Sequence, residues 1–263
     1  MHAAPLLRSQ ALAILLAAFS ALAFAQPQKA PAAYEPSVGQ EGKDVVWVPT
    51  PQALVNKMLD MAKVTPRDFV MDLGSGDGRT VITAAKRGAH ALGIEYNPDM
   101  VALSQKNAQK EGVSGRARFM KADLFETDLS KATVITMFLL PEINLKLRPR
   151  ILALKPGTRI VSNTFSMGEW EADQKATLNG ADGCNATYCT ALLWIVPARV
   201  AGAYTLPQGD LVLKQEFQML SGTLRAEGKT VVVEGKVRGE EVSFKAGGKE
   251  YRGRMNGGKL ELR

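Results

Sequence analysis

A short glycine-rich segment, residues 69–79, constrains the fold of this 263-residue chain more than any other feature. It begins with the apolar run Phe69–Leu73 and continues through Gly74, Gly76 and Gly78 into a pattern typical of a helix. Glycine accepts positive φ angles and lets a ligand approach the main chain closely. The N–H groups at the start of a helix point toward such a ligand. The segment therefore predicts a strand, a tight turn and a helix that together hold a nucleotide-like cofactor.

Strand and helix patterns alternate around this segment. Such alternation is typical of an α/β fold that is Rossmann-like and doubly wound, with a mostly parallel sheet. Ligands of these sheets bind beyond the carboxyl ends of the strands, where the glycine turn is expected. The expected strands cover residues 69–73, 91–95, 117–122, 133–140, 158–163 and 191–196, and the expected helices cover residues 50–63, 80–87, 97–111 and 142–154. Pro149 is expected to kink or break the last helix.

The pattern changes after residue 165. Residues 166–189 are polar, and from about residue 199 short β-type runs alternate with turns that contain glycine. These runs predict a C-terminal antiparallel β extension. The predicted organisation is a signal peptide at 1–25, a linker at 26–44, an α/β domain at 45–198 and a small β-rich extension at 199–263.

The first 25 residues have the features of a secretory signal peptide. Arg8 precedes an apolar run, and Ala23-Phe24-Ala25 provides an A-x-A cleavage site. A membrane anchor is the alternative, although the run is short for a bilayer span. Export predicts a periplasmic protein with no stable membrane span after cleavage. In that compartment Cys184 and Cys189 are expected to form a disulfide, whereas without export they would stay free thiols.

Composition argues against several classes of function. Removal of His2 with the signal peptide leaves only His90, so neither a Ser-His-Asp triad nor a metal site is expected. The formal net charge is +7, but the basic residues are scattered and lack the interleaved aromatic residues of a nucleic-acid surface. No nucleic-acid partner is therefore expected, while attraction to anionic lipid or to an acidic partner stays open.

Three acidic residues accompany the first three expected strands. Asp72 and Glu95 lie at the ends of the first two, and Asp123 follows the third, so the three are expected to face one crevice. This arrangement, over residues 45–170, resembles the class I S-adenosylmethionine-dependent methyltransferases. The resemblance implies that Glu95 holds the ribose hydroxyls, that Asp123 holds the adenine amine and that Asp72 orients the glycine loop. The residues implied to bind S-adenosylmethionine are Thr50, Asp72, Gly74, Ser75, Gly76, Gly78, Glu95, Asp123 and Leu124.

Further motifs narrow the resemblance. They are similar to the family of ATP-synthase c-subunit lysine methyltransferases and their bacterial relatives, and they lie at Val48–Pro51, Asp72–Arg79, Phe138–Pro141 and Asn144–Pro149. That family implies an acceptor pocket at the turn after the fourth strand. The substrate-side candidates are Phe138, Pro141, Asn144 and Trp170. The chain lacks the Asn/Asp-Pro-Pro-Tyr/Phe motif of many amino methyltransferases and has Phe-Leu-Leu-Pro in its place.

The favoured function is N-methylation of a lysine in a protein partner. A sulfonium methyl group is already activated, so positioning can supply much of the acceleration. No catalytic base is identified, because Glu142, the nearest candidate, suits the N-terminus of a helix. One alternative is a catalytically weak cofactor-binding scaffold of the cell envelope. The other is an NAD-dependent oxidoreductase, which Asp123 and the Arg79 in place of a final glycine disfavour. The sequence leaves the oligomeric state open.

Overall fold

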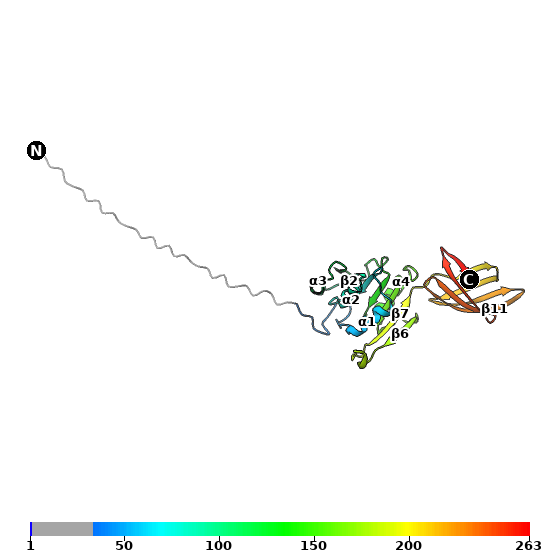
Figure 1. Cartoon of the computed structure of the whole chain (residues 1–263), viewed down its shortest axis with the longest axis horizontal. Helices are drawn as coiled ribbons and strands as arrows, with labels where there is room; N and C mark the ends of the chain where they lie inside the picture. Colours follow the sequence, from blue (N-terminus) through cyan, green and yellow to red (C-terminus); the bar gives the residue numbers. More distant parts are fainter. Residues whose placement is uncertain (2–33) are drawn as a thin grey trace. The chain divides into compact units, whose positions relative to one another are not determined.

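The computed structural model describes Met1 and residues 34–263. The expected signal peptide and the first part of the expected linker lie outside the described residues, apart from Met1. Residues 34–263 form one compact unit with two sheets of seven strands each (Figure 1). Within the described part of the chain, no helix is long and apolar enough to cross a membrane. The predicted α/β fold with a C-terminal antiparallel sheet is confirmed.

The first sheet carries the glycine turn. Its order is β3-β2-β1-β4-β5-β7-β6, and β7 runs antiparallel to both β5 and β6 while the other pairs are parallel. The strand order reverses at β1, which places the switch point of the sheet beside the turn. The strands are β1 Phe69–Leu73, β2 His90–Glu95, β3 Ala117–Lys121, β4 Val134–Met137, β5 Arg159–Asn163, β6 Gln174–Thr177 and β7 Thr190–Ile195.

Strand β6 is not predicted by the sequence, which is mostly polar over residues 166–189. It pairs with β7 at the edge of the sheet, and three of its four residues are exposed. Polar edge strands protect a sheet against pairing with other chains. They therefore lack the apolar alternation by which strands are found in sequence.

Helices cover both faces of the first sheet, as a doubly wound fold requires. Helices α1 to α3 share a core with Val70, whereas α4 shares a second core with Met71, because successive strand residues point to opposite faces. Pro149 does not break α4. The carbonyl that it leaves without an N–H donor belongs to Leu145, a residue that is 40% exposed. The helices are α1 Gln52–Met61, α2 Arg79–Lys86, α3 Pro98–Lys110 and α4 Pro141–Leu152, with a short 3-10 helix η1 Gly180–Asp182.

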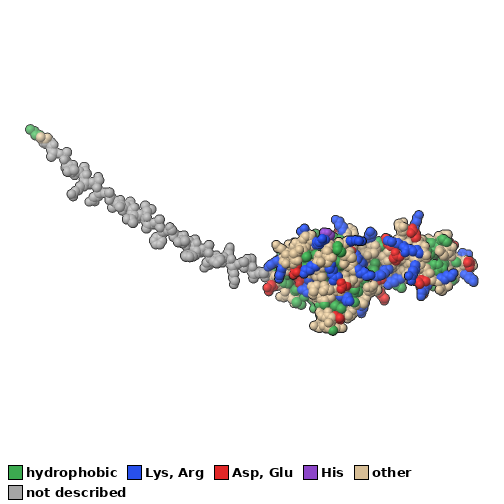
Figure 2. All heavy atoms as spheres, in the orientation of Figure 1, with side chains coloured by type: hydrophobic (Ala, Val, Ile, Leu, Met, Phe, Trp, Pro, Cys, Tyr) green, Lys and Arg blue, Asp and Glu red, His purple; other side chains and the backbone are tan. Residues whose placement is uncertain are grey.

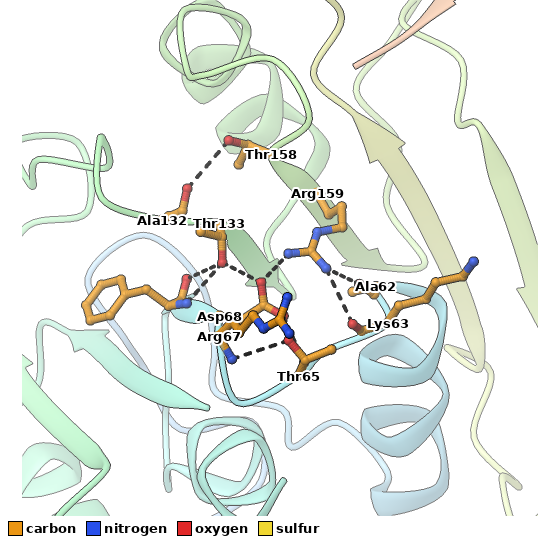
Figure 3. Close-up of polar contacts among 10 residues, drawn as sticks. Ala62, Lys63, Thr65, Arg67, Asp68, Ala132, Thr133, Thr158 and Arg159 are labelled. Carbon is orange, nitrogen blue, oxygen red and sulfur yellow. Dashed lines mark hydrogen bonds and ion pairs between the residues drawn. The ribbon is translucent and has the colours of Figure 1, made fainter. Parts of the chain in front are cut away.

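An ion pair between Asp68 and Arg159 joins strands at the amino-terminal end of the first sheet (Figure 3). The Asp68 carboxylate also accepts hydrogen bonds from the Thr65 N–H and the Thr133 hydroxyl, each at 2.8 Å. Burial acts to raise the pKa of Asp68, but Thr65, Thr133 and Arg159 outweigh it and hold that pKa below its usual value. The carboxylate therefore stabilises the fold above its unfolded pKa of about 3.9, and this stabilisation is lost as the pH falls through the lower folded pKa.

The second sheet is an antiparallel meander that encloses its own core. Each strand pairs with the next along the chain, and Leu211, Val233 and Phe244 are among its buried side chains. The turns Gly247-Gly248 and Gly257-Gly258 have positive φ at both residues, as tight hairpins require. The strands are β8 Gly202–Leu206, β9 Gly209–Glu216, β10 Met219–Ala226, β11 Lys229–Arg238, β12 Glu241–Ala246, β13 Lys249–Asn256 and β14 Lys259–Leu262.

Side chains from the two sheets contact each other directly. The ring of Phe217, between β9 and β10, stacks on Trp170 with ring centroids 6.2 Å apart, and the Arg148 guanidinium lies 5.3 Å from the centre of the same ring. Lys236 Nζ pairs with Asp173 Oδ1 at 3.0 Å. Trp170 is completely buried.

Candidate functional site

The turn from β1 to α2 has the backbone that its glycines predict. Gly74, Gly76 and Gly78 have φ angles of +75°, +53° and +83°, which residues with a Cβ atom rarely adopt. The N–H groups of Gly74 and Ser75 donate to the carbonyl of Ile94 at 2.9 and 3.0 Å. The turn is therefore fastened to the carboxyl end of β2.

Glu95 links the turn to the end of β2. Its carboxylate accepts hydrogen bonds from the N–H groups of Gly76 and Asn97, both at 2.9 Å. A carboxylate offers about four lone-pair sites, so half of its accepting capacity is left for hydroxyl groups of a ligand.

Asp72 lies under the turn and is 6% exposed. It accepts a hydrogen bond from the Thr136 hydroxyl of β4 at 2.6 Å. Burial, reinforced by the nearby charges of Asp77 and Glu95, raises the pKa of Asp72 to about 7. The group is thus poised to change its charge near neutral pH.

Asp123 follows β3 and is partly exposed. It accepts hydrogen bonds from Lys43 Nζ and from the N–H of Phe125, the latter at 2.8 Å. The hydrogen bond from Lys43 is the main reason that the pKa of Asp123 lies below its usual value. The loop that follows is fixed by Arg150, which donates to the carbonyls of Leu124, Phe125 and Thr127.

Residues 40–50 cross the same region, although the sequence places residues 40–44 in a linker and predicts only Thr50 of this segment as a site residue. Lys43 Nζ also lies 4.8 Å from the centre of the Tyr96 ring. A Cβ atom on Gly76 would lie 2.5 Å from Trp47 Nε1, so this glycine also makes room for the indole. Thr50 is buried, and its hydroxyl accepts a hydrogen bond from Asn163 Nδ2 at 3.3 Å.

These elements surround a cavity at the carboxyl end of the sheet. Its walls include the N-terminal segment 40–50, the glycine turn, the ends of β2 and β4 and the loop after β3. The predicted site residues that line it are Thr50, Asp72, Gly74, Ser75, Gly76, Glu95, Asp123, Leu124 and Phe138. Nine of the thirteen predicted cofactor-binding and substrate-side residues therefore line the cavity, and the structure adds most of the N-terminal segment.

Comparison with known proteins agrees with this geometry. Residues 72–174 match the family model of the ANTKMT methyltransferase domain. A protein-lysine N-methyltransferase of Saccharolobus islandicus is 46% identical over 142 residues, which make up 53% of this chain and 87% of the archaeal protein. A solved RNA methyltransferase of Salinibacter ruber, in complex with S-adenosyl-L-homocysteine, is 44% identical with a TM-score of 0.54 and covers 58% of this chain and 96% of its own.

The chain belongs to the same family of S-adenosylmethionine-dependent methyltransferases as the archaeal protein. The human ATP-synthase c-subunit lysine N-methyltransferase is a further relative, 34% identical over 128 residues. These residues make up 48% of this chain and 54% of the human protein, so the chain spans about half the length of that relative.

The cavity of the methyltransferase fits S-adenosylmethionine. Ser75 Oγ is buried at the cavity wall and has no hydrogen-bond partner within the described residues, so a polar ligand can satisfy it. Asp72, Glu95 and Asp123 surround the cavity with carboxylates, which suits a ligand with a sulfonium, an ammonium and hydroxyl groups. The individual roles of Glu95 with the ribose and Asp123 with the adenine stay predictions.

Four predicted site residues do not line the cavity of the methyltransferase. Gly78 is a packing position, since a Cβ atom there would lie 2.7 Å from Phe119 and Ser104. Pro141 is exposed at the start of α4. Asn144 is buried and donates to the carbonyls of Phe165 and Ser166. Trp170 is enclosed against Phe217 and Trp194.

The structure also adds residues that sequence reasoning missed. Lys43, Trp47 and Arg150 reach the site through contacts between segments far apart in the chain. Of these three residues, only Trp47 has a local sequence signal, because it directly precedes the Val48–Pro51 motif. No spacing rule identifies Lys43 or Arg150.

Proposed function

We propose that this methyltransferase transfers the methyl group of S-adenosylmethionine to the ε-amino group of a lysine in a protein. The proposal of a lysine acceptor rests on the 46% identity to a protein named as a protein-lysine N-methyltransferase, over 87% of that protein's length. The human relative, named for lysine methylation of the ATP-synthase c-subunit, supports the same acceptor chemistry.

The chain's own residues would act by binding and orientation. The glycine turn and the carboxylates of Asp72, Glu95 and Asp123 would hold the cofactor, which would supply the activated methyl group and leave as S-adenosyl-L-homocysteine. Glu142 is exposed at the start of α4 and does not line the cavity, so no step is assigned to it. A lysine ammonium must lose its proton, to a base or to water, before its nitrogen attacks the methyl group.

The test is transfer of labelled methyl groups from S-adenosylmethionine to fractionated cell lysate, followed by mass spectrometry of the labelled product. We expect the label on lysine, in material that protease destroys and nuclease leaves intact. Label that nuclease removes would overturn the proposal in favour of the RNA acceptor named for the Salinibacter protein. On the face shown in Figure 2, Lys and Arg side chains are interspersed with acidic and apolar ones, which favours the protein acceptor.

Glu95→Ala provides the matched inactive variant. It should abolish cofactor binding by calorimetry, because Glu95 holds the glycine turn at Gly76. Glu111→Ala is the control, since Glu111 is an exposed carboxylate that pairs with Lys86 outside the cavity.

We further propose that the protein is exported to the periplasm. The features of residues 1–25 and the disulfide between Cys184 and Cys189 support export. Fractionation with mass spectrometry of the N-terminus should find a chain that begins at Gln26 outside the cytoplasm. A chain that keeps residues 1–25 in the cytoplasmic fraction, with free thiols, would contradict export. An exported enzyme also needs a supply of cofactor outside the cytoplasm.

A further inference from the structure

Three aromatic side chains meet beside the cofactor cavity. Phe138 follows β4, Phe165 follows β5, and Tyr188 precedes β7. The ring centroid of Phe138 lies 5.9 Å from that of Phe165 and 5.3 Å from that of Tyr188. All three side chains are partly exposed, and Phe138 also lines the cavity. The aromatic cluster Phe138–Phe165–Tyr188 therefore connects the cavity wall with solvent.

The backbone on both sides of this cluster is held in place. Tyr188 lies in the loop closed by the disulfide between Cys184 and Cys189, and both cysteines are buried in the core shared with α1. Asn144 donates to the carbonyl of Phe165 at 3.2 Å. The rings are thus fixed by a covalent link on one side and a buried amide on the other.

We propose that Phe138, Phe165 and Tyr188 form the entrance through which the acceptor lysine reaches the cavity, with Tyr188 held in position by the Cys184–Cys189 loop. The inference rests on the proposed function. Aromatic faces attract ammonium groups, and a lysine side chain has an apolar stem that packs against rings while its charge stays accessible. A cluster at the cavity wall offers both contacts to one side chain.

The test compares Tyr188→Ala and Tyr188→Phe in the full chain, with a synthetic peptide that contains one lysine as the acceptor. Tyr188→Ala should raise the acceptor KM between about twofold and thirtyfold, the range for cation–π contacts from exposed to desolvated sites. Tyr188→Phe keeps the ring and should restore the wild-type KM. The affinity for S-adenosylmethionine, measured by calorimetry, should not change in either variant.

Tyr251→Ala is the control, because Tyr251 stacks on Phe244 in the second sheet and does not line the cavity. If the wild type is active and Tyr188→Ala leaves the acceptor KM unchanged, the proposed entrance is wrong while the proposed function still holds. A loss of cofactor affinity equal to the rise in KM also overturns it, because Tyr188 would then act on the cofactor site. A wild type that binds S-adenosylmethionine but methylates no amine overturns the proposed function itself.

The role of the disulfide is tested by replacing both Cys184 and Cys189 with alanine. If the loop acts by positioning Tyr188, this change should raise the acceptor KM, and adding Tyr188→Ala should raise it little further. Fully additive effects, or an unchanged KM in the cysteine variant, would overturn the positioning role of the loop.

Discussion

The buried carboxyl of Asp72 makes the stability of the fold depend on pH. Its carboxyl is buried, and burial raises its pKa to about 7, well above the unfolded value of about 3.9. The folded state therefore binds the proton more tightly than the unfolded state. The resulting stabilisation is complete below about pH 4 and is lost as the pH rises through about 7.

Asp72→Asn should consequently make the protein more stable than the wild type above pH 7, by about 1.4 kcal/mol for each unit of pKa shift that it relieves. The two proteins should converge toward pH 4. Denaturant unfolding across this range measures the effect, with Asp60→Asn as a control because Asp60 is an exposed carboxylate. The same variant should bind S-adenosylmethionine more weakly. An equal stability difference at every pH would show that Asp72 is not titrating.

Lys43 provides a second prediction for a single residue. It donates a hydrogen bond to Asp123, the carboxylate that is expected to accept one from the adenine amine. Lys43→Met should free Asp123 and tighten cofactor binding at low salt by no more than about fivefold, since exposed ion pairs contribute little. High salt should narrow the difference between the variant and the wild type. Calorimetry at two salt concentrations decides this, and weaker binding by the variant would mean that Lys43 contacts the cofactor instead.

At the scale of elements, the site depends on how the loop after β3 is anchored to α4. Arg150 lies in the last turn of α4 and donates to three carbonyls of the loop, with Thr127 O at 2.5 Å. Asp123 and Leu124, which line the cavity, belong to the same loop. Arg150 therefore sets the position of one wall of the cofactor site without itself lining the cavity.

Arg150→Met should raise the dissociation constant for S-adenosylmethionine several-fold while kcat at saturating cofactor stays close to that of the wild type. The dissociation constant of the Arg150→Lys variant should lie between those of the wild type and Arg150→Met, because an ammonium cannot reach three carbonyls as a guanidinium fork does. Arg116→Met is the control, since Arg116 donates to the Gly88 carbonyl outside the cavity. A fall in kcat alone would place the role of Arg150 in the transfer step.

At the scale of the whole molecule, the aromatic contact between Trp170 and Phe217 couples the two sheets. Each sheet has its own core, so their joint stability depends on a few side chains such as Lys236 and Asp173. The contact also explains why Trp170, a substrate-side candidate by sequence, serves packing instead.

Phe217→Ala should reduce the free energy of unfolding by about 2 kcal/mol, less than for a fully buried phenylalanine. It should also separate thermal unfolding into two transitions, because the link between the two cores is weakened. Calorimetry measures both effects, and Phe217→Tyr, which keeps the ring, is the control. A single transition with an unchanged midpoint would show that the second sheet is coupled through other contacts.

The sequence by itself determined the elements whose signals are local. The glycine turn needs positive φ at Gly74 and Gly76, and the apolar runs of β1, β2 and β4 need a buried sheet, so their type and order follow from short stretches of residues. The carboxylates of Asp72, Glu95 and Asp123 could be placed together because parallel strands end at one edge.

The tertiary structure alone decided the features that depend on contacts between distant segments. It brought Lys43 of the expected linker, and Trp47 just after that linker, to the cavity. It also enclosed Trp170 away from the cavity and paired the polar strand β6 at an edge. Sequence periodicity does not predict such contacts, because each one depends on where a second, distant segment packs. Local propensities do not determine that position. Tyr188 belongs to the same class, since only the folded chain places its ring against Phe138.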